Sequence, residues 1–203
     1  MSEKVSKNFF IDTNILVDYI LLKEILKEED KPNFPIYDSL EPSLKLIDFL
    51  INNKKIRWCT SFVNLCEMPS ALIKDIVLSR MYIKRIPFQY FDKYYSNFIK
   101  QKNFKKQVEN IVNKYYKFLT DNKIWFIDSM NITKKEDFQK IDDLKIDFRL
   151  PLGDSLIFFI AKKEGGFFVT SDMHHFKDVG KKYANEIEVI SPKQALEKAK
   201  KLI

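Results

Sequence analysis

Short apolar runs alternate along the chain with longer segments whose apolar residues recur every three to four positions. The short runs have the length of buried strands, and the longer segments have the spacing of amphipathic helices. This alternation predicts an α/β fold with a mostly parallel central sheet of about five strands. The predicted strands are Asn8–Ile11, Ile56–Thr60, Ile124–Ile127, Phe167–Thr170 and Ile187–Ile190.

Capping residues mark several of the predicted helix boundaries. Ser61 is placed to cap the helix that follows the second strand. Thr133 with Glu136 and Ser191 with Gln194 each have the form of a capping box. The apolar segment Leu152–Glu164 is followed by two glycines, which is typical of a helix C-terminus. These signals support helices between the predicted strands.

Two segments have the character of insertions. Residues 28–42 contain three prolines and several charges, which predicts a loop or an insertion. Residues 85–122 are rich in Tyr, Phe and Lys and predict a helical insertion. The length of 203 residues favours one domain over the whole chain, residues 1–203.

The composition excludes several classes of protein. Hydrophobic residues make up 45% of the chain and aromatic residues 14%, which is enough for a buried core and excludes a disordered chain. The apolar runs are far shorter than the roughly 20 residues that cross a bilayer, so no membrane partner is expected. Because the N-terminus also lacks the pattern of a signal peptide, we expect a soluble, cytoplasmic protein.

Charge and cysteine content narrow the candidate chemistry only slightly. The net charge of +7 permits a polyanionic partner but does not establish one. Cys59 and Cys66 are the only cysteines, so they cannot complete a zinc site of the usual kind, and we expect both to be buried thiols.

Acidic residues follow two of the predicted strands. Asp12 comes directly after the first strand, and Asp172 comes after the fourth. The carboxyl ends of parallel strands meet at one edge of the sheet, where ligands bind in α/β proteins. Two further acids stand out: Glu67 lies in the helix after the second strand, and Asp154 lies in the first turn of an otherwise apolar helix.

Each of these acids also has a purely local explanation. Asp12 can cap the first helix, Asp172 can be a turn residue, and Asp154 can complement a helix dipole. Glu67 falls nearly opposite the apolar stripe of its helix, which favours a solvated position. Pro69 should in addition disturb the turn that carries Glu67.

Taken together, the segments around these acids resemble the motifs of the PIN-domain nucleases. The resemblance extends from about Asn8 to Ile190, and its first and fourth motifs are the more specific ones. In chain order, the motifs are Phe10-Ile11-Asp12-Thr13-Asn14, then Thr60-Ser61 with Asn64-Leu65-Cys66-Glu67, then Gly153-Asp154-Ser155-Leu156-Ile157, and finally Thr170-Ser171-Asp172.

The resemblance implies a three-layer α/β/α fold and a metal-dependent endoribonuclease, of the kind found among VapC toxins. The acids Asp12, Glu67, Asp154 and Asp172 would then be catalytic residues that hold Mg²⁺ or Mn²⁺, since hard divalent cations prefer carboxylate oxygens. Neighbouring polar and basic side chains would position the phosphate or a metal-bound water. The candidates for that role are Thr13, Asn14, Ser171 and Arg149.

Partners and alternatives stay open at the level of the sequence. The resemblance implies an RNA substrate and allows an antitoxin partner and a homodimer. The alternatives are a catalytically inactive PIN-fold protein that binds nucleic acid or acts as a scaffold, and a nuclease that acts on DNA. Within residues 90–106, aromatic side chains and lysines could bind bases and phosphates, or could be the core and solvent faces of an amphipathic helical insertion.

Overall fold

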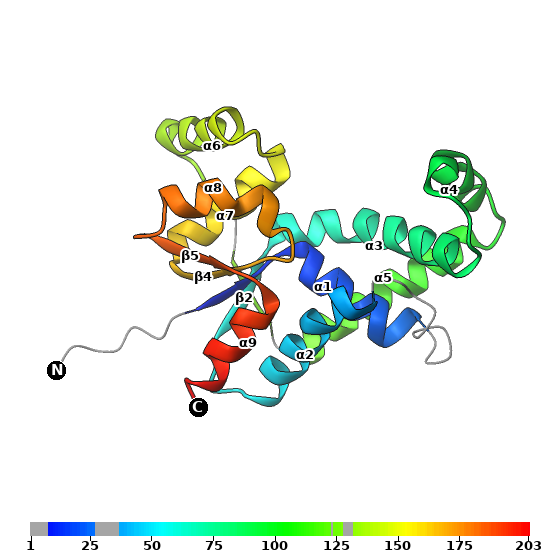
Figure 1. Cartoon of the computed structure of the whole chain (residues 1–203), viewed down its shortest axis with the longest axis horizontal. Helices are drawn as coiled ribbons and strands as arrows, with labels where there is room; N and C mark the ends of the chain where they lie inside the picture. The colour runs from blue at the N-terminus through cyan, green and yellow to red at the C-terminus, as the bar shows by residue number, and fades with distance from the viewer. Residues whose placement is uncertain (1–7, 27–36, 123, 128–131) are drawn as a thin grey trace.

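The computed structural model describes residues 8–26, 37–122, 124–127 and 132–203, and it is an α/β structure (Figure 1). The strands form an all-parallel sheet in the order β3-β2-β1-β4-β5, which confirms the predicted parallel α/β class. The three-residue β3 lies at one edge of this sheet. The strand bounds are β1 Phe9–Ile11, β2 Trp58–Ser61, β3 Trp125–Ile127, β4 Gly166–Val169 and β5 Ile187–Ile190.

The side chains of the central strands point alternately to the two faces of the sheet. Phe9 and Ile11 of β1 belong to one buried apolar cluster, whereas Phe10 between them belongs to the other. In the same way, β4 places Phe167 on the first face and Phe168 on the second. Because both faces are apolar, both must be covered, and this explains why the strands are continuous hydrophobic runs.

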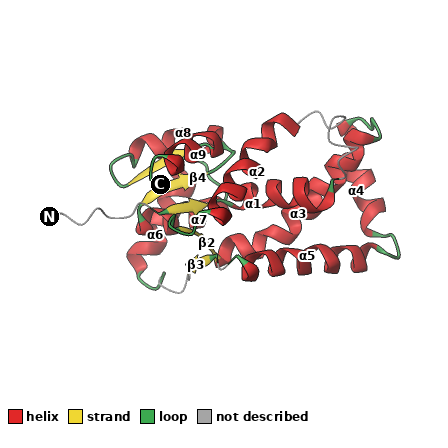
Figure 2. Cartoon of the chain, turned by 90° about the horizontal axis from the view of Figure 1, so that it is seen from below, coloured by secondary structure: helices red, strands yellow, loops and turns green. Residues whose placement is uncertain are grey.

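Helices cover both faces of the sheet, which gives three layers (Figures 1 and 2). The first face packs against α1 (Thr13–Ile20), α2 (Tyr37–Asn52), α3 (Phe62–Ile83) and α9 (Pro192–Lys200). The second face packs against α6 (Lys135–Asp147), α7 (Leu152–Glu164) and α8 (Met173–Lys182). A short π-helical segment, η1 (Leu21–Ile25), continues α1.

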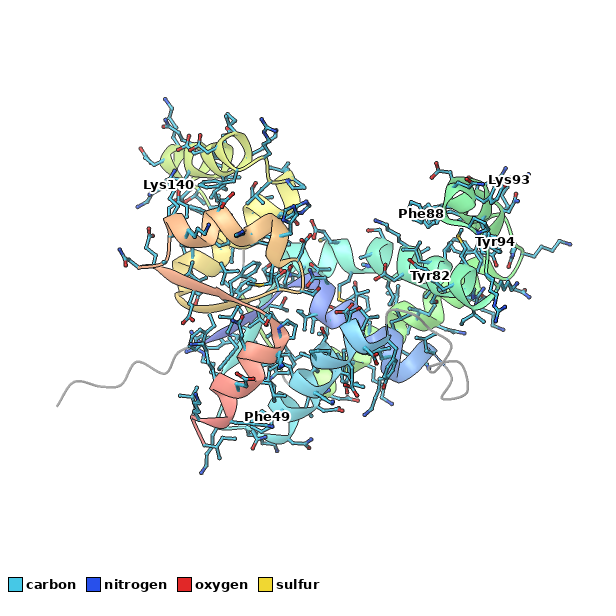
Figure 3. The ribbon with its side chains drawn as sticks, viewed as in Figure 1. Phe49, Tyr82, Phe88, Lys93, Tyr94 and Lys140 are labelled. Carbon is cyan, nitrogen blue, oxygen red and sulfur yellow. The ribbon has the colours of Figure 1, made fainter. Side chains whose placement is uncertain are left out.

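The long helix α3 carries a helical extension beyond the sheet. Its 22 residues span about 33 Å, so its C-terminal half projects past the strands. The 3₁₀ turn η3 (Phe88–Tyr90) and α4 (Phe91–Ile99) lie at the far end, and α5 (Phe104–Asp121) runs back beside α3 (Figure 2). Figure 3 shows Phe88, Lys93 and Tyr94 at this far end, away from Lys140 of α6. The helical character predicted for residues 85–122 is confirmed.

Three predictions about local structure are wrong in part. Residues 37–42, predicted as loop, form the start of α2 with Pro42 inside the helix, whereas residues 27–36 lie outside the described part of the chain. Pro69 does not interrupt α3, although a proline there removes one intrahelical hydrogen bond. Cys59 is buried as expected, but Cys66 is exposed on α3.

The caps predicted at Ser61 and Ser191 are confirmed, whereas the one predicted at Thr133 is wrong, because α6 has Lys134 at its N-cap and no side-chain cap hydrogen bond. The Ser61 hydroxyl accepts a hydrogen bond from the backbone N–H of Asn64, and Ser191 forms a capping box with Gln194. Helix α7 ends at Gly165, which has φ 69°. In the part of the chain that the structure describes, no helix combines the length and apolar character needed to span a bilayer.

Candidate functional site

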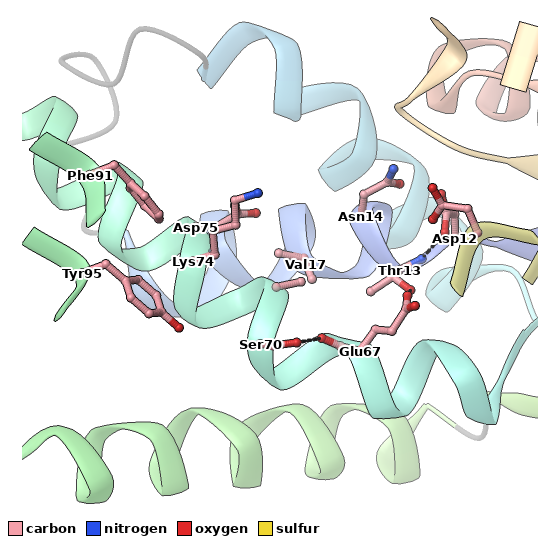
Figure 4. A pocket seen from close by; sticks show the side chains of 12 residues that line it. Asp12, Thr13, Asn14, Val17, Glu67, Ser70, Lys74, Asp75, Phe91 and Tyr95 are labelled. Carbon is pink, nitrogen blue, oxygen red and sulfur yellow. Dashed lines mark hydrogen bonds between the residues drawn. The ribbon is translucent and has the colours of Figure 1, made fainter. Parts of the chain in front are cut away.

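A cavity of about 640 Å³ opens beside the carboxyl end of β1 (Figure 4). It brings together residues from the start of α1, from one face of α3, from α4 and from the start of α7, which are far apart in the sequence. Its described lining residues are Asp12, Thr13, Asn14, Val17, Glu67, Ser70, Ala71, Lys74, Asp75, Phe91, Tyr95 and Asp154.

Asp12 is a helix cap and a buried carboxyl group of this cavity at the same time. Its Oδ1 accepts the backbone N–H of Thr13 at 2.7 Å, and its Oδ2 accepts the hydroxyl of Thr170 at 2.8 Å. Burial raises the pKa of Asp12 to about 7; these two hydrogen bonds oppose the rise, and the nearby Asp154 and Glu67 add to it. The local and the functional interpretation of Asp12 are therefore compatible.

Thr170 belongs to the fourth motif of the sequence, which predicts no role for this side chain by itself. Besides donating to Asp12, its hydroxyl accepts the Nδ2–H of Asn14 at 3.2 Å and the backbone N–H of Asp172 at 3.1 Å. One hydroxyl has a single hydrogen and two lone pairs, so Thr170 is fully satisfied. The signals for Thr170 in the sequence are its place in this motif and at the end of a predicted strand, two residues before an acid.

Two of the predicted phosphate-positioning residues, Asn14 and Ser171, take part in the same hydrogen bonds that join the ends of β1 and β4. The side chain of Asn14 donates to Thr170 and accepts the backbone N–H of Ser171 at 3.4 Å. Asn14 lines the cavity, whereas Ser171 is exposed and reaches the site through its backbone. The contacts of both residues hold the strand ends in register.

Glu67 faces the cavity from α3 and is half-buried, so it is less solvated than its position on the helical wheel predicts. Its Oε2 lies 3.4 Å from the hydroxyl of Thr13, which donates to it. Burial raises the pKa of Glu67, the charge of Asp154 adds to the rise, and the Thr13 hydrogen bond opposes it. A β-carbon on Gly153 would overlap the Glu67 carboxylate, so this glycine leaves the space that Glu67 occupies.

Asp154 reaches the cavity from the first turn of α7. Burial raises its pKa, His175 opposes the rise, and Asp172 adds to it. Among the described residues, its carboxylate has no hydrogen-bond or ion-pair partner. Its oxygens therefore keep lone pairs available for a ligand.

Asp172 and Arg149 are placed differently from the other candidates. Asp172 caps α8, with its Oδ1 accepting the backbone N–H of His175 at 3.3 Å and its Oδ2 lying 3.0 Å from Nδ1 of the same residue. It is not among the described residues that line the cavity, but its charge raises the pKa of Asp154, which does line it. Arg149 is exposed before α7 with φ 54° and is not among the described residues that line the cavity.

Acidic side chains outnumber basic ones among the described residues that line the cavity. Its described lining includes the carboxyl groups of Asp12, Glu67, Asp75 and Asp154 but a single ammonium group, that of Lys74. Sequence reasoning missed Asp75, whose pKa burial raises to about 6, with Lys74 opposing the rise. Carboxylates crowded in this way favour a cation. Nevertheless, within the described residues no three His, Cys, Asp or Glu side chains are grouped closely enough to hold a metal ion as they stand.

A comparison of the chain with family models and with curated proteins gives no match. The resemblance to PIN-domain nucleases therefore depends on the motif residues themselves and on where the fold places them.

A second buried acid, Asp18, follows the cavity-lining Val17 on α1. It predicts a pH dependence of the stability that can be tested. It is 5% exposed, and its Oδ2 accepts the hydroxyl of Ser43 at 2.8 Å. Burial raises its pKa to about 7; Ser43 opposes the rise, and Asp75 and Asp12 add to it. A raised pKa means that folding favours the protonated form, so stability is lost as the pH rises from about 4 to about 7.

We expect Asp18→Asn to be more stable than the wild type at pH 8, by roughly 2–4 kcal/mol, and to gain nothing at pH 4. The amide is neutral at both pH values, and its oxygen can still accept the Ser43 hydroxyl. Urea denaturation at pH 4, 6 and 8 measures the effect. Asp142→Asn, at an exposed position of α6, is the matched control. An equal gain at all three pH values would contradict a buried carboxylate as the cause.

Proposed function

We propose that this chain is a metal-dependent nuclease that hydrolyses RNA phosphodiester bonds at the cavity beside β1. The observation that supports the proposal best is that Asp12, Glu67 and Asp154 line one cavity although they come from different elements. Their charges act on one another, because Asp154 raises the pKa of both Asp12 and Glu67. These positions are the ones that the PIN resemblance assigns to the reaction.

The donor set fits Mg²⁺ or Mn²⁺ in its chemistry. Hard divalent cations prefer carboxylate oxygens, and three such groups surround a cavity with little positive charge of its own. Asp12, Glu67 and Asp154 would hold the ion, with Asp172 acting from the rim through water. A bound ion supplies an activated water and neutralises charge that develops on the phosphate.

The proposal requires the carboxylates to draw closer together when the ion binds. Asp12 is the fixed point, because Thr13 and Thr170 hold both of its oxygens. Glu67 has one long hydrogen bond, of 3.4 Å, and Asp154 has none among the described residues, so their side chains can rotate at small cost. Lys74, farther along α3, can neutralise a phosphate of the bound strand.

The resemblance supports three further proposals, which concern the substrate, the cellular role and the assembly of the protein. It favours RNA over DNA as the substrate, a cytoplasmic toxin that an antitoxin inhibits, and assembly as a homodimer. The main rival function is a PIN-fold protein that binds nucleic acid without cutting it. The presence of all four acids favours the nuclease over this rival.

A cleavage assay tests the proposal directly. Labelled RNA and DNA panels are incubated with the protein in Mg²⁺, in Mn²⁺ and in chelator, beside the Asp12→Asn/Asp154→Asn double variant. Cutting that needs the metal and is lost in the variant supports the nuclease. If neither protein cuts, calorimetry with Mn²⁺ decides whether the acids bind a metal at all, and no binding would rule the proposal out.

The contact between Gly153 and Glu67 gives a sharper prediction. Gly153→Ala should displace the Glu67 carboxylate and lower metal-dependent cleavage about 10- to 100-fold, since a small misplacement of a catalytic group costs on that order. Stability should change little, because alanine favours a helix more than glycine does and the displaced group is the flexible end of a side chain.

A double-mutant cycle provides the control for this prediction. In a Glu67→Ala background there is no carboxylate to displace, so adding Gly153→Ala should have almost no further effect on cleavage or on Mn²⁺ affinity. If Gly153→Ala costs the same with and without Glu67, its effect has another cause.

A further inference from the structure

The cavity continues from the acids to a pair of aromatic rings on the helical extension. One face of α3 forms its floor, with lining residues at helical spacing from Glu67 to Asp75, a rise of about 12 Å. Phe91 and Tyr95 of α4 close the far end, and both project into the space opposite the acids (Figure 4). The site is thus an elongated groove with Asp12, Glu67 and Asp154 at one end and the two rings at the other, where Lys74 and Asp75 lie beside Phe91 (Figure 4).

Phe91 contacts two neighbouring rings, that of Tyr95 in a tilted arrangement and that of Phe88 in a stacked one. The ring centroids of Phe91 and Tyr95 are 5.5 Å apart, and Phe88 stacks on Phe91 at 5.8 Å. Phe88 is 70% exposed, whereas Phe98, on the same helix as Phe91, is 4% exposed. Phe98 anchors α4 in the core, and Phe91 and Tyr95 are only partly buried against that core, so part of each ring faces the cavity.

We propose that Phe91 and Tyr95 form a stacking platform for an unpaired base of a single-stranded RNA whose backbone reaches the acids. This inference rests on the proposed nuclease function and names its substrate class. Stacking of a base on an aromatic side chain contributes about 1–3 kcal/mol and requires a free base face. Bases in a duplex are already stacked on one another, so a duplex cannot use these rings.

The chemistry along the groove matches such a strand better than an apolar ligand. Between these three acids and the rings lie the small residues Ser70 and Ala71, which leave room for a backbone. Lys74 supplies a cation for one phosphate, with Asp75 next to it. Its volume of about 640 Å³ lies within the usual range of ligand pockets, roughly 300–1,000 Å³. A lipid or an apolar peptide would have to lie against the acids, which is unfavourable.

Binding measured without cleavage tests the platform. All proteins carry Asp12→Asn/Asp154→Asn, which removes two negative charges and prevents cutting, and chelator is present. Fluorescence anisotropy compares this protein with two derivatives. One adds Phe91→Leu/Tyr95→Leu, which keeps apolar bulk, and the other adds Phe138→Leu, at a ring on α6 that is 55% exposed and belongs to the opposite part of the molecule.

We expect Phe91→Leu/Tyr95→Leu to weaken the binding of a short single-stranded RNA at least 10-fold and Phe138→Leu to leave it unchanged. A series of RNAs, each with one abasic site at a different position, should contain one member that binds the parent protein weakly. The leucine variant should not distinguish this RNA from the intact strand. A fully paired RNA duplex should bind both proteins equally weakly.

Several results would overturn the platform. They are unchanged binding by a leucine variant that urea denaturation shows to be folded, an abasic penalty that persists in that variant, or no binding of the strand by the parent protein. The proposed nuclease function is tested separately, by cleavage with the protein that keeps all four acids. Ring-dependent binding without any cleavage keeps the platform and rejects the nuclease, whereas cleavage with ring-independent binding does the reverse.

Discussion

Asp12→Asn should lower metal-dependent RNA cleavage at least 1,000-fold while the protein stays folded. Loss of a group on which charge stabilisation of the transition state depends costs about 10²–10³ in rate. Loss of Asp12 should cost at least as much because, among the described acids that line the cavity, it is the one whose two oxygens both accept hydrogen bonds, at 2.7 and 2.8 Å. In the proposed metal site, Asp12 would therefore set the position toward which Glu67 and Asp154 converge.

The hydrogen bonds of Asp12 explain why asparagine replaces its shape but not its role. The amide oxygen can still accept the Thr13 N–H, so the cap of α1 is kept. An amide nitrogen in the place of Oδ2 cannot accept the Thr170 hydroxyl. It cannot donate to that hydroxyl either, since both lone pairs of the oxygen are taken by Asn14 and the backbone of Asp172.

Three measurements check this prediction together. Single-turnover cleavage in Mn²⁺ gives the loss in rate, calorimetry gives the loss in Mn²⁺ affinity, and urea denaturation at pH 8 shows that the variant is folded. Its stability at pH 8 should not fall below that of the metal-free wild type, because a buried carboxyl group with a pKa of about 7 is replaced by a neutral amide. Cleavage within 10-fold of the wild type would mean that Asp12 is only a helix cap.

The fold was predictable because its strands are buried on both faces. β1 has the sequence Phe-Phe-Ile, with all three residues fully buried, and such a run has no polar alternation that could be mistaken for a surface strand. The predicted strand ranges therefore coincide with the observed ones to within two residues. Asp12 and Asp172 could be placed at the carboxyl edge for the same reason.

The candidate site was less predictable because it depends on how helices pack. The apolar stripe of α3 suggested a solvated Glu67, but α1 and α4 pack against other parts of α3 and enclose the face that carries Glu67 and Asp75. Hydrophobic periodicity reports which residues meet the core, not which polar residues a neighbouring helix will cover. The hydrogen bond from Thr170 to Asp12 depends on the register of β1 with β4, and no local sequence pattern predicts that register.

The prolines show the same limit in secondary structure. Pro42 and Pro69 both lie inside helices, where sequence reasoning expected a loop or a disturbed turn. In α2, the burial of Leu46, Ile47 and Leu50 offsets the low helix propensity of the segment that contains Pro42. Tertiary packing decides such cases, and it is invisible to a local rule.

Gly166→Ala should destabilise the protein by about 3 kcal/mol or more, whereas Gly165→Ala should cost about 1 kcal/mol. Both glycines have positive φ, 92° and 69°, so each alanine carries backbone strain. They differ in their surroundings. A β-carbon on Gly166 would overlap the backbone of Asn8, whereas one on Gly165 would meet only the Glu186 carbonyl oxygen, at 4.0 Å.

The substitution at Gly166 should also disturb the candidate site, because the pairing of β1 with β4 connects the two. The backbone of Asn8 accepts the N–H of Phe167 at 2.9 Å, so pushing Asn8 away opens the pairing of β1 with β4 at its first hydrogen bond. The other end of this pairing holds Thr170 against Asp12. Urea denaturation of the two variants measures the difference, and Mn²⁺ calorimetry should show weaker binding in Gly166→Ala alone. Equal costs at the two glycines would mean that φ strain, and not the close approach to Asn8, sets the requirement for glycine.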